Sequence, residues 1–332
     1  MEFRAFGKTG LKVGVLGFGA GAVGGLMVRG SAADQDRAVG MALDVGINYF
    51  DTAPQYGMGE SEKNLGRIIN ARKMDVVLGT KVRVPPEAKG DIGAEIARGM
   101  DASLTRLAQD HVELFQLHNP ITESGAGAGD LSLQQVLEEV IPAFQKLQKA
   151  GKTRFFGITA IGDTAALHKV ISSGRINSAQ VSYNMLNPSA GGAVPVGYPA
   201  QDYEAMLQLC QLHGVGTIGI RALAAGALSG TDKRHPIASA PPEPIGSSLS
   251  YDRDLARAQR FMPVVTEGHA GSLLEAALRF PISCPALSTM LFGIATVEEF
   301  EGGLAAGLKG PLSAAALARL AELRAGFVGE AR

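Results

Sequence analysis

The sequence predicts an α/β protein, a closed (β/α)8 barrel with an N-terminal β-hairpin, and three observations support this fold class. Short apolar runs alternate with amphipathic stretches along almost the whole chain, the pattern of parallel β/α units. The alternation supplies eight strands with no linker or break in composition. A length of 332 residues suits one large barrel. We therefore expect residues 1–332 to form one TIM-barrel domain rather than an open doubly wound sheet.

The first 17 residues, MEFRAFGKTGLKVGVLG, differ from the repeating pattern and predict a hairpin. The turn is expected between Gly7 and Gly10, because glycines punctuate a short polar stretch there. The second arm is expected to lead into the first barrel strand at residues 13–17.

The first barrel helix is expected in DQDRAVGMALDVG, residues 34–46. Ala38, Met41, Ala42 and Val45 follow the i, i+3, i+4, i+7 spacing of one helical face, and Gly46 is a typical helix terminator.

The later units repeat this alternation, and each strand is a short, mainly apolar run. We expect Pro142 to interrupt the helix that contains it, because proline lacks a backbone N–H. The predicted strands are 47–51, 76–81, 113–118, 154–159, 178–183, 216–220 and 286–293, and the predicted helices are 60–70, 92–107, 133–150, 163–172, 203–213 and 272–280.

Three connections are unusually long: residues 119–132, 187–201 and 228–250. All three follow the C-terminal ends of strands, the face on which barrels build their active sites. We therefore expect them to form substrate walls or lids. For the Pro- and Ser-rich third loop, a disordered surface segment is the alternative.

The composition favours a small-molecule partner. A net charge of −1, from 31 basic and 32 acidic residues, gives no long-range attraction to nucleic acid or to an anionic membrane surface. No apolar run reaches the ~18 residues needed to span a bilayer. We expect a monomer or a small homo-oligomer.

The cysteines favour a cytoplasmic protein without a structural metal. Cys210 and Cys284 show neither a C-x-x-C motif nor metal-type spacing, which fits a reducing compartment. Residues 13–28 are uncharged and faintly resemble a signal peptide, but their six glycines make a poor helix.

The stretch GFGAGAVGG contains a G-x-G-x-x-G at Gly19, Gly21 and Gly24, the spelling of a dinucleotide-binding turn. Such a turn needs a helix to begin at the third glycine, but GLMVRGSAA follows without an apolar period. Asp51 would be the ribose partner in this alternative, so spacing alone does not exclude it. We favour a glycine-rich loop at the mouth of the first strand, where a flat ligand can approach the backbone.

Four polar residues stand at or just beyond neighbouring strand ends: Asp51, Tyr56, Lys81 and His118. In a barrel these strands direct their C-terminal residues toward one mouth, so we expect the four side chains to converge. A tyrosine hydroxyl ordinarily has a pKa of roughly 10, and a neighbouring ammonium favours the phenolate. The set therefore predicts proton transfer at a carbonyl or alcohol, with Tyr56 as the acid or base. Lys81 would lower the pKa of Tyr56, and Asp51 would hold Lys81 in place. His118 would orient the substrate oxygen.

The stretches NYFDTAPQYGMGESEKNLGRII, GTK and LFQLHNP resemble the aldo-keto reductase family, and the resemblance extends over nearly the whole chain. It implies a (β/α)8 barrel whose catalytic tetrad is the same Asp, Tyr, Lys and His. It also implies a nicotinamide dinucleotide that lies extended across the C-terminal mouth without a Rossmann turn. Gly19 and Ala20 would then lie near the nicotinamide.

The resemblance implies further cofactor contacts. Thr159 and Gln180 match carboxamide-binding positions, whereas Ala160 stands where many members carry an asparagine. Ile220 or Arg221 stands where the family often places an aromatic stacking residue, with Leu223 nearby.

The segment LFGIATVEEFEGGLAA aligns with the adenosine end of the cofactor site, at Gly293, Thr296 and Glu299. NADPH-preferring members commonly carry a lysine at the first of these positions and an arginine at the last. A glutamate would repel a 2′-phosphate, so we predict NAD in preference to NADP. Alternatively, Glu299 is a solvated residue in a first helical turn.

The stretch EVIPAFQKLQKAGKTRFFGIT is similar to the NAD-linked sugar dehydrogenase branch, which includes L-galactose, L-fucose and D-threo-aldose dehydrogenases. The resemblance implies oxidation of an aldose to a lactone, or reduction of a small polar aldehyde. One alternative is a catalytically quiet nucleotide-binding redox sensor that acts through a protein partner. A flavin-dependent barrel, which would be yellow, is another.

Overall fold

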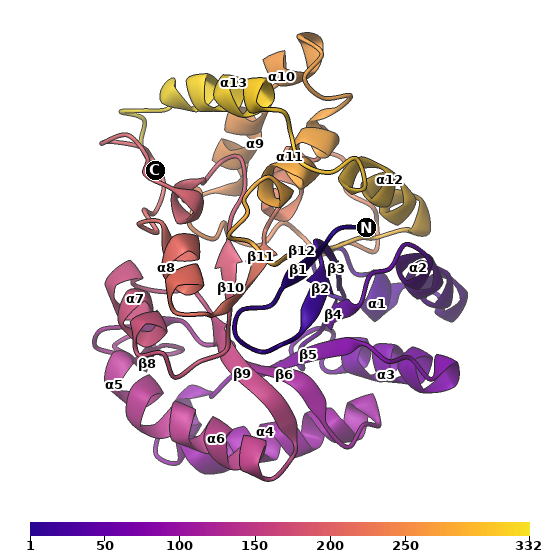
Figure 1. The fold of residues 1–332 in the computed structure, drawn as a ribbon, viewed down its shortest axis with the longest axis vertical. Coiled ribbons are helices and arrows are strands. Elements are labelled where there is room, and N and C mark those ends of the chain that lie inside the picture. Colours follow the sequence, from indigo (N-terminus) through magenta and orange to yellow (C-terminus); the bar gives the residue numbers. More distant parts are fainter.

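The computed structural model describes residues 1–332, and its central feature is a closed barrel of eight parallel strands. Neighbouring strands follow the order β10-β11-β12-β3-β4-β5-β6-β9. Figure 1 shows the helices arranged around this barrel. The predicted fold class is confirmed. The barrel strands are β3 (Leu16–Gly19), β4 (Tyr49–Asp51), β5 (Val77–Val82), β6 (Val112–Leu117), β9 (Thr153–Thr159), β10 (Ser178–Ser182), β11 (Gly216–Ile220) and β12 (Thr289–Phe292).

The N-terminal hairpin crosses one end of the barrel (Figure 1). Its strands β1 (Phe3–Ala5) and β2 (Lys12–Gly14) pair antiparallel. Between them, Phe6 packs with Val13 against buried residues near the N-terminal ends of barrel strands, so the hairpin closes the end opposite the expected active site. The prediction of a barrel strand at residues 13–17 is wrong in its boundary. Residues 12–14 are bonded to β1, so the barrel strand begins only at Leu16.

The other seven strands lie within three residues of their predicted bounds, and the predicted helices are also present. The first helix starts earlier than expected because Ser31 caps it by accepting a hydrogen bond from the Asp34 N–H. The helix expected at 203–213 begins only at Met206 because Glu204 and Ala205 have left-handed φ angles of 49° and 55°. These helices are α2 (Ala32–Asp44), α3 (Glu60–Arg72), α4 (Ile92–Leu107), α7 (Thr164–Ser172), α8 (Met206–Leu212) and α11 (Leu273–Ile282).

The helix expected at 133–150 is interrupted near Pro142, as predicted. It consists of α5 (Leu133–Gln135), a π-helical turn at Val136–Val140, and α6 (Ile141–Lys149). Pro142 cannot donate a backbone hydrogen bond to the preceding turn, and the wider π-helical turn lies directly before it.

Several elements were not predicted from the sequence. They include a parallel strand pair within the 119–132 loop and four helices after residue 250. Residues 231–250 form neither helix nor strand, but they contact the loops that follow β3 and β10, since Ser239 N–H donates to Val23 O and Gln201 N–H donates to Gly246 O. The unpredicted elements are α1 (Leu26–Arg29), β7 (Ile121–Thr122), β8 (Leu131–Ser132), α9 (Tyr251–Gln259), α10 (Pro263–Thr266), α12 (Val297–Gly307) and α13 (Ala314–Ala325), with 3-10 turns at Pro86–Ala88, Ser189–Gly191 and Ala224–Ser229.

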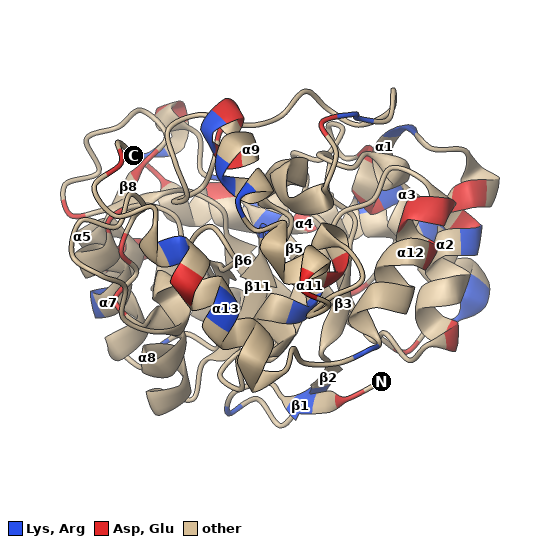
Figure 2. Cartoon of the chain, turned by 90° about the horizontal axis from the view of Figure 1, so that it is seen from above, with Lys and Arg blue, Asp and Glu red and all other residues tan.

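Charged residues of both signs are interspersed over the molecule, and no region of one sign dominates Figure 2. This distribution agrees with a net charge of −1. None of the helices has the length and apolar character required to cross a lipid bilayer.

Candidate active site

The structure brings the four predicted residues together at the C-terminal mouth of the barrel. Asp51 ends β4, Lys81 lies in β5, His118 directly follows β6, and Tyr56 lies in the loop after β4. Lys81 Nζ lies 2.5 Å from Asp51 Oδ1 and 3.4 Å from the Tyr56 hydroxyl oxygen. The rings of Tyr56 and His118 meet edge to face, with centroids 6.2 Å apart.

The turn that carries Tyr56 depends on glycine. Gly57 and Gly59 have φ angles of 64° and 92°, a region that other residues adopt only with strain. A Cβ on Gly57 would also lie 2.3 Å from the Val28 side chain. The chain can therefore reverse tightly after Tyr56 and start α3 at Glu60, which leaves the phenol above Lys81.

Lys81 is a fully buried cation that stays charged. Burial on its own lowers the pKa of Lys81, but the Asp51 carboxylate and the Tyr56 hydroxyl raise it by more, so the net pKa lies above the usual value for lysine. Its ammonium also donates to the Thr52 carbonyl at 2.8 Å. A permanent positive charge is therefore fixed beside the phenol oxygen.

His118 is held as a neutral imidazole. Burial lowers its pKa to about 3, and the positive charges of Lys81 and Arg83 act in the same direction. Its Nδ1 lies 3.3 Å from Gln55 Oε1. A neutral imidazole carries one N–H donor and one acceptor nitrogen, so His118 is suited to orienting an oxygen atom rather than to carrying charge.

Tyr49 is a partner of the site that the sequence reasoning missed. Its hydroxyl donates to Asp51 Oδ2 at 3.1 Å, and Gln180 Nε2 donates to the same oxygen at 2.6 Å. Burial, together with the charge of Asp51, raises the pKa of Tyr49 well above its usual value, so the phenol remains a donor. Gly79 makes room for it, because a Cβ there would lie 2.9 Å from the Tyr49 hydroxyl.

We expect Tyr49→Phe to lower the free energy of unfolding by about 1.5–3 kcal/mol, the range for a hydrogen bond to a charged group. Urea denaturation measures this change. Tyr203→Phe is the matched control, because Tyr203 is also buried but its hydroxyl makes no hydrogen bond within the chain. Equal effects of the two substitutions would show that the Tyr49–Asp51 contact contributes nothing specific.

The predicted carboxamide contacts lie beside this cluster. Thr159 and Gln180 stand opposite one another on β9 and β10, and the Thr159 hydroxyl lies 3.5 Å from Gln180 Oε1. The Gln180 amide nitrogen is committed to Asp51. Its oxygen has only the long Thr159 contact, which leaves it able to accept a hydrogen bond from a carboxamide.

The G-x-G-x-x-G does not open a dinucleotide-binding helix, and the closed parallel barrel overturns the Rossmann alternative. Gly19 ends β3, and space is open beside Gly21, where a Cβ would meet nothing within 4 Å. Gly24 allows a backbone contact, since a Cβ there would lie 2.2 Å from Ile294 O. One expectation is corrected here, because Leu26–Arg29 forms the one-turn helix α1 where we expected no helix.

The remaining predicted cofactor residues lie in two segments at the mouth. Ile220 ends β11, and Arg221 and Leu223 follow it, all three half-buried. Thr296 caps α12 by accepting a hydrogen bond from the Glu299 N–H at 3.1 Å. Glu299 is exposed in the first turn of this helix, and its Oε2 accepts from the Ala295 N–H at 2.8 Å.

Gly293 is exposed at the start of the second segment, close to the glycine-rich loop, since a Cβ on it would lie 3.8 Å from Gly24 N. Ala20 is buried, and its N–H donates to Asp51 O at 2.9 Å, so the Ala20 N–H is already paired.

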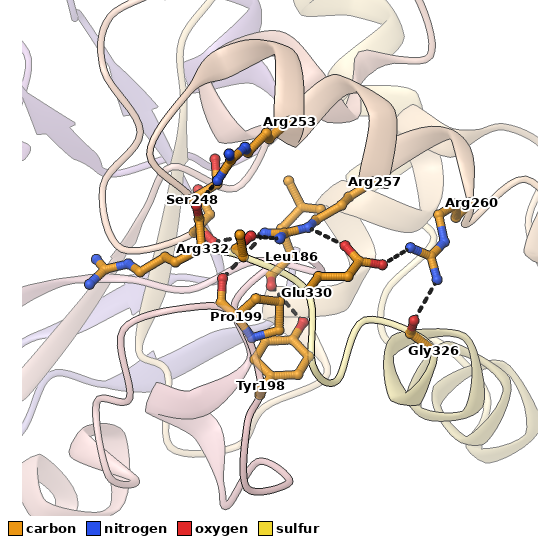
Figure 3. A network of polar contacts seen from close by, with 12 residues as sticks. Leu186, Tyr198, Pro199, Ser248, Arg253, Arg257, Arg260, Gly326, Glu330 and Arg332 are labelled. Atoms are coloured by element: carbon orange, nitrogen blue, oxygen red, sulfur yellow. Dashed lines mark hydrogen bonds and ion pairs between the residues drawn. The ribbon is translucent and has the colours of Figure 1, made fainter.

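Arg257 of α9 ties the 187–201 loop to the C-terminal segment (Figure 3). Its guanidinium donates to Pro199 O at 3.2 Å and to Ala331 O at 2.7 Å, and it pairs with Glu330 at 3.1 Å. Arg260 also pairs with Glu330 and donates to Gly326 O. The 187–201 loop is therefore held at Pro199 by the side chain of Arg257, which lies far from it in the sequence.

Two proteins with similar sequences are named as sugar dehydrogenases. L-galactose dehydrogenase of Arabidopsis thaliana is 30% identical over 318 residues, which cover 92% of this chain and 88% of that protein. D-threo-aldose 1-dehydrogenase of a Pseudomonas species is 28% identical over 321 residues, or 87% and 88% of the two chains. These relatives confirm the resemblance to the sugar dehydrogenase branch.

Among solved structures, an aldo-keto reductase from Bacillus halodurans in its holo form has a TM-score of 0.73 and 23% identity, and the match covers 97% of this chain and 96% of that one. This likeness concerns the fold. The sequence profile described as the aldo/keto reductase family matches residues 15–325. Because that profile spans nearly the whole chain, this protein belongs to the aldo-keto reductase family.

Proposed function

We propose that this protein is an NAD(P)-dependent oxidoreductase that interconverts a carbonyl and an alcohol, acting as an aldose 1-dehydrogenase or as a reductase of a small polar aldehyde. The observation that carries the proposal is the chain of contacts from Asp51 through Lys81 to Tyr56, beside His118. A phenol next to a buried, permanently charged ammonium is suited to exchanging a proton with a substrate oxygen.

Aldo-keto reductases bind NAD(P), and the residues at this mouth fit such a group. Gln180 Oε1 and the Thr159 hydroxyl offer an acceptor and a donor to a carboxamide, and the open space beside Gly21 admits a ligand close to the backbone. When bound, the nicotinamide supplies or accepts the hydride.

The chain's own residues then handle the proton. In the oxidative direction the Tyr56 oxygen takes the proton of the substrate hydroxyl, and in the reductive direction it returns that proton to the carbonyl oxygen. Lys81, 3.4 Å away, stabilises the phenolate, and Asp51 holds Lys81 in place. His118, as a neutral imidazole, orients the substrate oxygen without competing for the proton.

The relatives support a sugar or another small polar carbonyl compound as the substrate, since two of them act on an aldose by name. The absence of tryptophan and an aromatic content of 6% also argue against a pocket for large flat hydrophobic substrates. A panel of aldoses, pyridoxal and simple aldehydes, followed at 340 nm with NAD and NADP, tests the proposal. Nucleotide binding without turnover of any hydroxy or carbonyl compound would contradict it and favour the redox-sensor alternative.

We expect NAD to be preferred to NADP by about 1.4–5-fold in kcat/KM, because the exposed Glu299 carboxylate would repel a 2′-phosphate and one exposed charge interaction amounts to about 0.2–1 kcal/mol. Glu299→Gln should remove most of this preference, a change of about 1.4–5-fold in the ratio of the two kcat/KM values. Glu301→Gln, which changes another exposed glutamate of α12, is the control. A tenfold preference for NADP in the unaltered protein would refute the inference.

We also propose a cytoplasmic protein that is a monomer or a small homo-oligomer. Cys210 and Cys284 are both buried and unpaired, which supports a reducing compartment.

A further inference from the structure

Tyr49 connects the N-terminal hairpin to the Asp51 carboxylate. It is the first residue of β4 and has no exposed surface, and its hydroxyl donates to Asp51 Oδ2 at 3.1 Å. Its ring stacks on the ring of Phe6, with centroids 6.2 Å apart and planes inclined by 26°. The contacts therefore run from the hairpin, through two rings and one hydroxyl, to the residue that holds Lys81.

Three barrel strands carry glycine where these two rings pack. A Cβ on Gly17 of β3 would lie 3.1 Å from Tyr49 Cδ1, and one on Gly79 of β5 would lie 2.9 Å from the Tyr49 hydroxyl oxygen. A Cβ on Gly216 of β11 would lie 2.7 Å from Phe6 Cδ1. Such close packing leaves a buried ring few alternative positions. The Tyr49 hydroxyl is therefore presented to Asp51 from a fixed place.

The orientation of the Asp51 carboxylate depends on its hydrogen bonds, because the terminal torsion of an aspartate side chain has a broad energy minimum. Oδ1 lies 2.5 Å from Lys81 Nζ, and Oδ2 accepts from Tyr49 and from Gln180 Nε2. Gln180 also offers its Oε1 to the proposed carboxamide, whereas the Tyr49 hydroxyl donates to Asp51 alone. Tyr49 is therefore the donor to Asp51 that serves no ligand.

We propose that Tyr49 and Phe6 are positioning residues: the Phe6 ring holds Tyr49, and the Tyr49 hydroxyl keeps the Asp51 carboxylate turned toward Lys81. The inference rests on the proposed function, in which Lys81 acts through its place beside Tyr56. Phe6 and Tyr49 are both completely buried, so neither reaches a ligand at the mouth. Changes at the hairpin end of the barrel should therefore alter the rate of the reaction without altering binding.

Tyr49→Phe keeps the ring and removes the hydroxyl. We expect it to lower kcat by about 5–20-fold, because a small displacement of acid–base groups lowers the rate steeply. The KM for the best substrate of the panel and the Kd for NADH should stay within about twofold, since neither ligand contacts Tyr49. Steady-state kinetics and a fluorescence titration measure these quantities.

Phe6→Leu removes the stacked ring and should lower kcat about threefold or more. When Tyr49→Phe is already present, adding Phe6→Leu should lower kcat by less than about 1.5-fold, because the hydroxyl through which Phe6 acts is gone. Phe3→Leu is the matched control, since Phe3 lies in the same hairpin but is 48% exposed, and it should leave kcat unchanged. Thermal melts establish that each variant is folded, and Tyr49→Phe keeps the test informative if Phe6→Leu does not fold.

Urea denaturation tests the link to Asp51 without turnover. Tyr49→Phe should shift the midpoint in the Asp51→Asn background by less than about half of its shift in the unaltered protein, because the charged acceptor is gone. Equal shifts in the two backgrounds would overturn the inference whether or not a substrate is found.

Two kinetic results would also overturn the inference while leaving the proposed function intact. One is a loss of kcat below about twofold in Tyr49→Phe, and the other is an equal effect of Phe6→Leu with and without Tyr49→Phe. Absence of turnover with every compound would count against the proposed function, and the urea measurements would then decide whether Tyr49 holds Asp51.

Discussion

Tyr56→Phe is expected to lower kcat by about 10²–10⁴-fold while leaving the Kd for NADH within about twofold of the unaltered protein. The change removes only the hydroxyl oxygen that lies 3.4 Å from Lys81 Nζ, and positioned acid–base groups typically contribute an acceleration of this size. Steady-state kinetics with the best substrate of the panel and a fluorescence titration of NADH measure the two quantities.

Tyr251→Phe is the control for this result. Tyr251 is half-buried at the start of α9, and its hydroxyl makes no hydrogen bond within the chain, so its loss should change kcat by less than twofold. Retention of more than a tenth of the activity in Tyr56→Phe would contradict the assigned role. It would direct attention to His118, whose neutral imidazole is the other polar group facing Tyr56.

The tetrad could be predicted because parallel strands of a barrel end at one rim. Asp51, Lys81 and His118 each stand at or near the end of a strand, so locating the strands was enough to bring them together. The first barrel strand was misplaced because residues 13–17 read as one apolar run. Only the antiparallel pairing of residues 12–14 with β1 separates the hairpin arm from β3.

Tyr49 was missed although a signal for it exists. It precedes Asp51 by two residues, and the period of two along a strand places both side chains on the same face. A polar hydroxyl one layer below a functional carboxylate is a predictable hydrogen-bond donor. Tyr49 was missed because the run INYFD indicates only a buried strand.

Other features depend on contacts that local patterns do not encode. Gly24 is part of a G-x-G-x-x-G motif, but the reason for a glycine there is the close backbone contact with Ile294, which is far away in the sequence. Arg257 likewise binds Pro199 and Ala331, each more than fifty residues away. Gly24 and Ile294 meet because the closed barrel places β12 beside β3, and Arg257 meets its partners because the loop after β10 and the C-terminal segment both lie against α9.

Asp51→Asn is expected to lower the free energy of unfolding by about 3–5 kcal/mol, the range for removing one partner of a buried ion pair. Lys81 is fully buried, and its ammonium would face an amide in place of a carboxylate. Tyr49 and Gln180 also donate to Asp51 Oδ2, so an amide nitrogen at that position would oppose two donors. Urea denaturation measures the loss, and a change below 1 kcal/mol would contradict it.

Two control variants distinguish the destabilisation caused by an uncompensated buried charge from the effect of replacing any aspartate by asparagine. Asp101→Asn removes the exposed partner of Lys152 and should change stability by less than about 1 kcal/mol. The double variant Asp51→Asn with Lys81→Met removes the unpaired ammonium, so it should be more stable than Asp51→Asn alone. If the double variant is instead less stable, the destabilisation arises from the hydrogen bonds of Tyr49 and Gln180 rather than from the uncompensated charge of Lys81.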